Sequence, residues 1–186
     1  MRMADRSGST AWASTISLRA DALADFAHRP TLRFMLSHPA HMLSLGFGAG
    51  LSPAAPGTVG TLLAFPLYWA LTQRLSPVGV LALIPILFVL GVWAAARTGR
   101  DLGVLDHGGI VWDEVVAFLL VLVFTPEGWE WGVTAFVVFR FFDIVKPPPI
   151  RHFDRTVKGG FGVMLDDLLA AFYTLMVLAL ASRVAG

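Results

Sequence analysis

The feature that most constrains the fold is the run from Pro77 to Ala96, which is mostly apolar and carries no charged side chain. A helix that crosses the hydrocarbon core of a bilayer needs about 20 such residues. Of the 186 residues in the chain, 15% are charged and 56% are hydrophobic, whereas an ordinary soluble domain has about 25% charged residues. We therefore expect a membrane protein with a single membrane domain.

Four shorter apolar runs also predict helices, whose ends neighbouring helices or a thinned interface would have to shield. These runs are Val59–Leu71, Ile110–Phe124, Trp131–Val145 and Asp167–Ala181. The predicted fold is all-α, a polytopic membrane bundle of about four to five helical segments formed by residues 38–186. Residues 1–37 contain no secretory signal and are expected to form a cytoplasmic tail. Within this tail, residues 31–39 predict a short helix on the membrane surface, with Phe34, Met35 and Leu36 inserted.

Basic residues indicate how the bundle is oriented. With the N-terminus in the cytoplasm, nearly all Lys and Arg residues fall on the cytoplasmic side, as the positive-inside rule requires. The loop TPEGWEW has two Glu and no Lys or Arg, and is placed outside. Three polar stretches, residues 46–61, 100–114 and 140–167, then share the cytoplasmic face. This arrangement predicts a single site at that interface.

Carboxylates are the conspicuous side chains of these stretches. Asp113 and Glu114 precede one apolar run, Asp166 and Asp167 precede another, and Asp143 ends a third. Each group alone is also explained as a partner of a helix dipole. If the groups converge, their repulsion calls for a cation, and carboxylate oxygens suit Mg²⁺. The absence of cysteine excludes thiolate metal sites. Mg²⁺ bound by carboxylates in turn indicates phosphate chemistry.

Two glycine-containing loops are candidates for holding a phosphate. Gly57 opens a predicted helix, whose N-terminal N–H groups favour an anion, and Ser52 and Thr58 add hydroxyl groups. No Lys follows, so this is not the nucleotide-binding loop. Lys158 precedes a Gly-Gly pair, and His107 is a candidate general acid for the leaving oxygen. Each of these stretches is also compatible with an ordinary loop or a structural histidine.

Three blocks together resemble the phosphatidylglycerophosphatase A family over roughly residues 38–182. They are GFGAGLSPAAPGTVGTLLAFP, DHGGIVWDEVVAFLLVL and FRFFDIVKPPPIRHFDRTVKGGFGVMLDDLLAA. The resemblance implies a multi-pass enzyme of the bacterial inner membrane with its site facing the cytoplasm. Such an enzyme uses Mg²⁺ to remove the terminal phosphate of phosphatidylglycerophosphate, giving phosphatidylglycerol. The chain departs from the expected pattern at Ala117, Ala171 and Pro148, none of which replaces a carboxylate or a cation.

By this resemblance, the acidic motif positions and the motif cations Lys146 and Lys158 fall on residues already selected above. Their individual roles are our inference. We expect metal ligation and catalysis at Asp113, Glu114, Asp143, Asp166 and Asp167, with His107 as a further catalytic group. We expect substrate binding at Ser52, Gly57, Thr58, Arg140, Lys146 and Lys158. The expected partners are the lipid substrate and the bilayer, with no nucleic acid and no obligate protein partner.

The main alternative is a cation- or proton-coupled transporter, because transporters also place carboxylates in membrane helices. Two other lipid enzymes are less compatible with the sequence. A CDP-alcohol phosphotransferase would need a D-G-x-x-A-R element, and a histidine-based lipid phosphatase would need P-S-G-H, and neither motif occurs.

Overall fold

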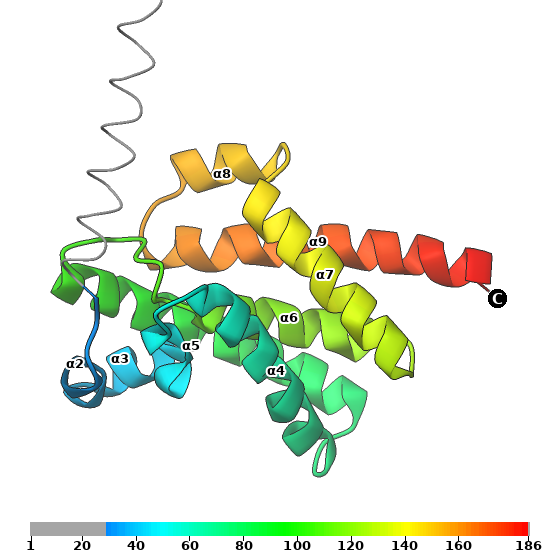
Figure 1. Ribbon diagram of the computed structural model, residues 1–186, viewed down its shortest axis with the longest axis horizontal. Helices are drawn as coiled ribbons and strands as arrows, with labels where there is room; N and C mark the ends of the chain where they lie inside the picture. Colours follow the sequence, from blue (N-terminus) through cyan, green and yellow to red (C-terminus); the bar gives the residue numbers. More distant parts are fainter. Residues whose placement is uncertain (1–28, 186) are drawn as a thin grey trace, which may run out of the picture.

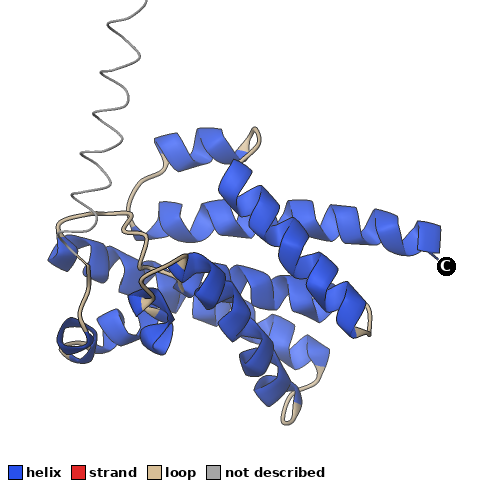
Figure 2. Cartoon of the chain, viewed as in Figure 1, coloured by secondary structure: helices blue, strands red, loops and turns tan. Residues whose placement is uncertain are grey.

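The computed structural model describes residues 29–185, and every regular element within that range is a helix (Figure 2). The prediction of an all-α fold is confirmed. Most of the predicted cytoplasmic tail lies outside the described residues. The elements are α2 (Leu32–Leu36), α3 (Pro39–Ser44), the 3₁₀ helix η1 (Gly46–Leu51), α4 (Pro56–Thr72), α5 (Pro77–Leu102), α6 (Trp112–Phe124), α7 (Trp129–Val145), α8 (Ile150–Thr156) and α9 (Gly160–Ala185).

Helix α6 is the centre of the bundle. Every residue from Val115 to Leu122 is buried, which is the pattern of a helix that is apolar on all sides and packed on all sides. Helices α4, α5, α7 and α9 pack against it (Figure 1). The first turn of α6 therefore lies where the other long helices meet, and this is where its two carboxylates are.

Two helices, α5 and α9, are long and apolar enough to cross a membrane. Each also exposes large apolar side chains, such as Ile86 and Val89 on α5 and Met176 and Leu180 on α9. This is weak evidence for a membrane, since it rests on length and composition. The other three predicted segments correspond to α4, α6 and α7, so the number of full crossings stays a prediction.

Helix α9 begins at Gly160, seven residues before the start predicted from the apolar run. Asp166 and Asp167 therefore lie inside the helix, near its second turn, and not at its entrance as predicted. The first residue of the helix lies directly against the backbone of α5. Only glycine fits at position 160, because a Cβ there would overlap the carbonyl oxygen of Val92 and lie 2.7 Å from the backbone nitrogen of Ala96. The close crossing of α5 and α9 thus extends the last helix beyond its apolar stretch.

The short N-terminal helices cap one end of the bundle. The predicted helix within residues 31–39 is present as α2, but Met35 is buried in the protein, so its predicted insertion into a membrane is wrong. Helix α3, which the sequence analysis did not predict, is anchored by His41. Its Nε2 lies 2.9 Å from Asp101 Oδ2, and Arg97 Nε donates to the same oxygen at 2.8 Å. Helix α8 was likewise not predicted.

Candidate active site

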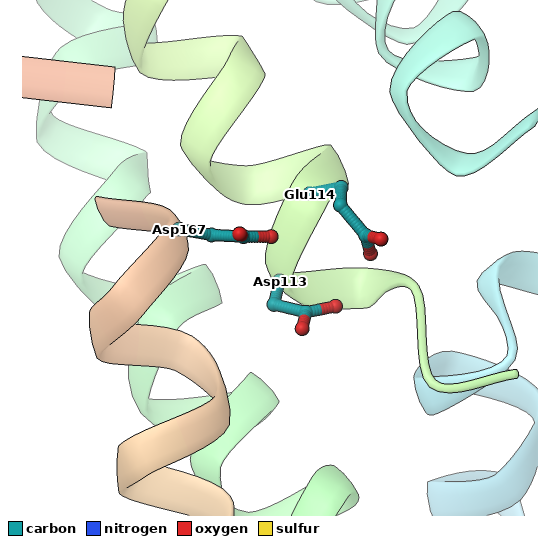
Figure 3. Close-up of side chains that lie close together, drawn as sticks. All are labelled: Asp113, Glu114 and Asp167. Atoms are coloured by element: carbon teal, nitrogen blue, oxygen red, sulfur yellow. The ribbon is translucent and has the colours of Figure 1, made fainter. Parts of the chain in front are cut away.

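Three carboxylates from two helices form a compact cluster. Asp113 and Glu114 belong to the first turn of α6, and Asp167 extends toward them from α9 (Figure 3). One oxygen from each carboxylate lies within 4.8 Å of the others. Asp113 and Asp167 are buried. Asp143 and Asp166 lie within electrostatic range of this pair, so the five predicted acidic residues do share one region.

Backbone contacts fix where α6 begins. The N–H of Val111 donates to the carbonyl of Ser44 at 2.9 Å. Gly50 and Gly109 touch backbone to backbone, because a Cβ on Gly50 would overlap the carbonyl oxygen of Gly109. A Cβ on Gly60 would lie 2.7 Å from Cβ of Val111. The glycines therefore bring η1, α4 and the start of α6 together, which positions the acidic pair.

Arg140 on α7 connects the acidic cluster to the N-terminus of α4. Its NH1 lies 2.5 Å from Asp143 Oδ2 and 3.6 Å from Glu114 Oε1, and donates to Thr61 Oγ1 at 3.4 Å. Thr61 in turn donates to the carbonyl of Gly57 at 2.9 Å. Two carboxylates, those of Asp143 and Glu114, thus share the guanidinium of Arg140.

If α7 continued regularly, Lys146 would lie on nearly the same helix face as Asp143. Instead, its side chain turns away from Asp143. Lys146 ends α7 in the left-handed region, at φ 45°, and its ammonium forms ion pairs with Asp166 and, at 2.9 Å, with Asp154. Burial alone would lower the pKa of Lys146, but the two carboxylates raise it above its ordinary value. Partial burial would raise the pKa of Asp154, but its hydrogen bond to Lys146 holds that pKa below the usual range. Lys146 is therefore a fixed cation beside the cluster.

A cleft of about 350 Å³ opens beside Glu114 and Arg140. Six of the predicted residues line it, namely Ser52, Gly57, His107, Glu114, Arg140 and Asp143. The hydroxyl of Ser52 donates to the carbonyl of Ala54 at 2.8 Å, so in this structure it closes a turn. His107 is buried, and its Nδ1 accepts the N–H of Gly109 at 2.9 Å.

Three other predicted substrate-binding residues lie outside this cleft lining. Thr58 follows Gly57 in α4, and Lys146 faces Asp154 and Asp166 as described. Lys158 is exposed; its ammonium donates to the carbonyl of Asp154 at 2.6 Å, and it lines a separate cavity of about 20 Å³. Lys158 and Gly57 therefore line different cavities in this conformation.

The donor set of the cluster suits a hard divalent cation. Asp113 Oδ1, Glu114 Oε2 and Asp166 Oδ1 are buried and have no hydrogen-bond partner among the described residues. Buried carboxylate oxygens are costly unless a charge or a donor compensates them. A Mg²⁺ ion would supply that charge, since it is typically bound by one or two carboxylates together with water and substrate oxygens. The residues present therefore fit Mg²⁺, the ion expected from the sequence.

Three residues of this region were not predicted from the sequence. Thr61 links Arg140 to α4, Asp154 binds Lys146, and Arg29 lines the cleft. Asp154 and Arg29 reach their partners across eight and 24 residues, which leaves no periodic signal. Thr61 carries one weak signal, since it lies four residues after Gly57 on the same helix face.

A helical bundle with buried carboxylates, paired cations and an adjoining polar cleft has the side chains of an enzyme that acts on phosphate esters. Comparison with known families makes the class specific. The sequence model of the family Phosphatidylglycerophosphatase A matches residues 42–182. The chain belongs to this family.

Individual relatives agree over most of their length. A Phosphatidylglycerophosphatase A of Haemophilus influenzae is 44% identical over 151 residues, covering 81% of this chain and 93% of the relative. One of Escherichia coli is 44% identical over 140 residues, covering 74% and 80%. A protein of Bacteroides thetaiotaomicron is 40% identical over 152 residues, covering 78% of this chain and 94% of the relative. It carries the provisional name phosphatidylinositol-3-phosphatase. No solved structure matches the chain significantly.

Proposed function

We propose that this chain hydrolyses phosphatidylglycerophosphate to phosphatidylglycerol and inorganic phosphate, as a Mg²⁺-dependent enzyme of phospholipid biosynthesis. The observation that carries the proposal is the cluster of Asp113, Glu114 and Asp167 beside a polar cleft, in a chain of this family. The names of two relatives state this activity for those proteins.

Asp113, Glu114 and Asp167 would hold the cation, with Asp143 and Asp166 as further ligands. When bound, Mg²⁺ would neutralise negative charge on the phosphoryl oxygens. In the part of the chain that the structure describes, one buried oxygen each of Asp113, Glu114 and Asp166 has no hydrogen-bond partner, which supports this assignment. The proposal also explains why repelling carboxylates are retained in the interior.

Arg140 and the first turn of α4 would hold the phosphate on its other sides. Arg140 lines the cleft next to Glu114, where a guanidinium is placed to stabilise charge that develops on the phosphoryl group. The first turn of α4 approaches the same point through Gly57, and its N–H groups favour an anion. Lys146 would keep Asp166 ionised and oriented, because it is the partner of that carboxylate.

His107 would donate the proton that the leaving glycerol oxygen needs. Because Nδ1 accepts the N–H of Gly109, the neutral ring carries its hydrogen on Nε2. A neutral imidazole is a weak proton donor, so the general acid would be the imidazolium form, in which Nδ1 gives up the hydrogen bond from Gly109. His107 lines the cleft, so a proton could reach it from there. The attacking group is either water or one of the cluster carboxylates. Acid quenching during turnover of substrate with a ³²P-labelled terminal phosphate separates the two, since only attack by a carboxylate leaves ³²P covalently bound to the protein.

The proposed setting is the bacterial inner membrane, with residues 38–186 embedded as a multi-pass domain and the site facing the cytoplasm. Helices α5 and α9 support membrane insertion. The concentration of Lys and Arg in the loops around the cleft supports the cytoplasmic orientation. Within the predicted tail of residues 1–37, Arg29, Pro30 and Met35 contact the embedded domain, and the residues before Arg29 would lie in the cytoplasm. The transporter alternative finds no support in the comparisons.

The test is phosphate release from phosphatidylglycerophosphate by protein purified in detergent, with Mg²⁺ and with a chelator. Asp113→Asn and Asp167→Asn should each lower kcat by at least about 100-fold, since several kcal/mol of charge stabilisation are lost. Glu127→Gln, at an exposed position, is the matched control and should keep wild-type activity. Wild-type rates in both aspartate variants would refute the assigned cluster.

A further inference from the structure

Two arginines from distant parts of the chain line the same cleft. Arg140 is largely buried, with 16% of its side chain exposed, and is bound by Asp143 and Glu114. Arg29 is exposed, and its NH2 donates to the carbonyl of Pro53 at 3.2 Å. The cleft thus has one cation beside the carboxylate cluster and a second on the loop that leads into α4.

The backbone around Arg29 is held against the cleft. A Cβ on Gly109 would lie 3.3 Å from Cγ of Pro30, and Gly109 itself lines the cleft. The contact to Pro53 ties Arg29 to the loop before α4. Arg29 therefore forms part of the wall between two loops, although it precedes the family match at residues 42–182.

The proposed substrate carries two phosphate groups with different fates. The terminal monoester is cleaved, so it must reach the carboxylate cluster and Arg140. The phosphodiester stays in the product, and it lies one glycerol unit away from the monoester. An anion that enters a partly desolvated cleft needs a cation or donors of its own, and Arg140 is already shared between two carboxylates at the reacting end.

We propose that Arg29 binds the phosphodiester of the lipid and so makes the site selective for phospholipid headgroups that carry a second phosphate. This inference rests on the proposed function. A guanidinium has five N–H donors in a planar array, so it can bind a phosphate while it keeps other hydrogen bonds. It also binds phosphate through two parallel hydrogen bonds, which a lysine ammonium cannot reproduce.

The experiment measures the two reaction products, phosphatidylglycerol and inorganic phosphate, separately as inhibitors of the enzyme. Phosphatidylglycerol carries only the diester, whereas inorganic phosphate represents only the monoester. Assays use a phosphate-free non-ionic detergent. In Arg29→Gln the inhibition constant of phosphatidylglycerol should rise roughly 10- to 100-fold, the usual effect of losing a charged hydrogen bond. The inhibition constant of inorganic phosphate should change less than about twofold.

Substrate kinetics should agree with the inhibitors. KM for phosphatidylglycerophosphate should rise in Arg29→Gln while kcat stays near wild type, and Arg29→Lys should recover only part of the loss. Arg33→Gln, an exposed arginine on neighbouring α2, is the matched control and should change neither inhibitor.

The inference is overturned by equal weakening of both inhibitors, by no weakening of either, or by a wild-type enzyme that phosphatidylglycerol does not inhibit. A failure of the proposed function itself looks different, because the wild type would then release no phosphate from phosphatidylglycerophosphate at all.

Discussion

Gly57 in the first turn of α4 lies directly against the carboxylate of Glu114 in α6, so that a Cβ at position 57 would overlap Glu114 Oε1 and lie 3.2 Å from NH1 of Arg140. The glycine therefore sets how closely the helix N-terminus approaches the carboxylate–guanidinium pair. We predict that Gly57→Ala displaces this pair and lowers kcat/KM by about 100-fold, a common result of a shift of about 1 Å in a catalytic group. Steady-state phosphate release measures the effect.

Gly132 in α7 provides the matched control for this substitution. A Cβ there would meet only Phe65, at 3.4 Å, so Gly132→Ala should keep wild-type activity and gain helix propensity of up to about 1 kcal/mol. Equal activity of Gly57→Ala and Gly132→Ala would show that the close approach has no catalytic consequence.

The buried carboxylate cluster also predicts an opposition between stability and activity. Without a cation, Asp113 and Asp167 repel one another, and replacing a buried charge by a neutral group of similar shape is often neutral or stabilising. In a chelator, Asp167→Asn should therefore melt at least as high as the wild type. Added Mg²⁺ should raise the melting temperature of the wild type through binding to the folded state, with a much smaller rise in the variant.

A thermal-shift titration in detergent measures both effects without requiring turnover. Glu127→Gln should respond to Mg²⁺ as the wild type does, because this glutamate is exposed and distant in sequence from the cluster. An identical Mg²⁺ response in the wild type and in Asp167→Asn would place the ion elsewhere.

The sequence predicts the helices of this fold better than their bounds. Helices α4, α5, α6, α7 and α9 follow from apolar composition, which is a local property. The start of α9 was missed because it depends on Gly160 fitting against Val92 and Ala96 of α5, a contact between segments far apart in the chain. Met35 was predicted to insert into the membrane because the sequence of a short apolar helix does not show whether lipid or another part of the protein covers its apolar side chains.

The candidate site shows the same difference between local signals, which the sequence contains, and contacts between distant segments, which it does not. Asp113 and Glu114 were selected because they are adjacent at a helix start, and Asp167 because the predicted topology puts its helix entrance on the same face. Lys158 was selected from its glycine neighbours, yet it donates to Asp154 outside the cleft. The partners of Lys146 could not be read from spacing, because the left-handed backbone at this residue turns its side chain off the α7 face.

Asp154 is predicted to position Lys146 without touching the substrate. Its carboxylate lies 2.9 Å from the Lys146 ammonium, which also binds Asp166. Asp154→Asn should lower kcat by about tenfold, in the range found for losing an outer partner of a metal ligand. Asp154→Glu should restore part of the activity by keeping the charge.

The apparent Mg²⁺ affinity distinguishes positioning from general destabilisation. It should weaken in Asp154→Asn because Asp166 loses its ordered cation, and it should stay unchanged in Arg155→Gln, an exposed neighbour on α8. An Asp154→Asn protein with wild-type kcat and wild-type Mg²⁺ dependence would contradict the role.

His107 is predicted to protonate the leaving oxygen, and the leaving group itself provides the test. Glycerol is a poor leaving group that needs a proton as the P–O bond breaks, whereas an aryl oxide with a low pKa does not. His107→Gln should lower kcat for phosphatidylglycerophosphate by about 100-fold or more, within the usual contribution of general acid catalysis. With a nitrophenyl phosphate ester that the wild type hydrolyses, the loss should shrink to a fewfold. A loss of the same size for both esters would mean that His107 holds Gly109 and the cleft wall in place and does not transfer a proton.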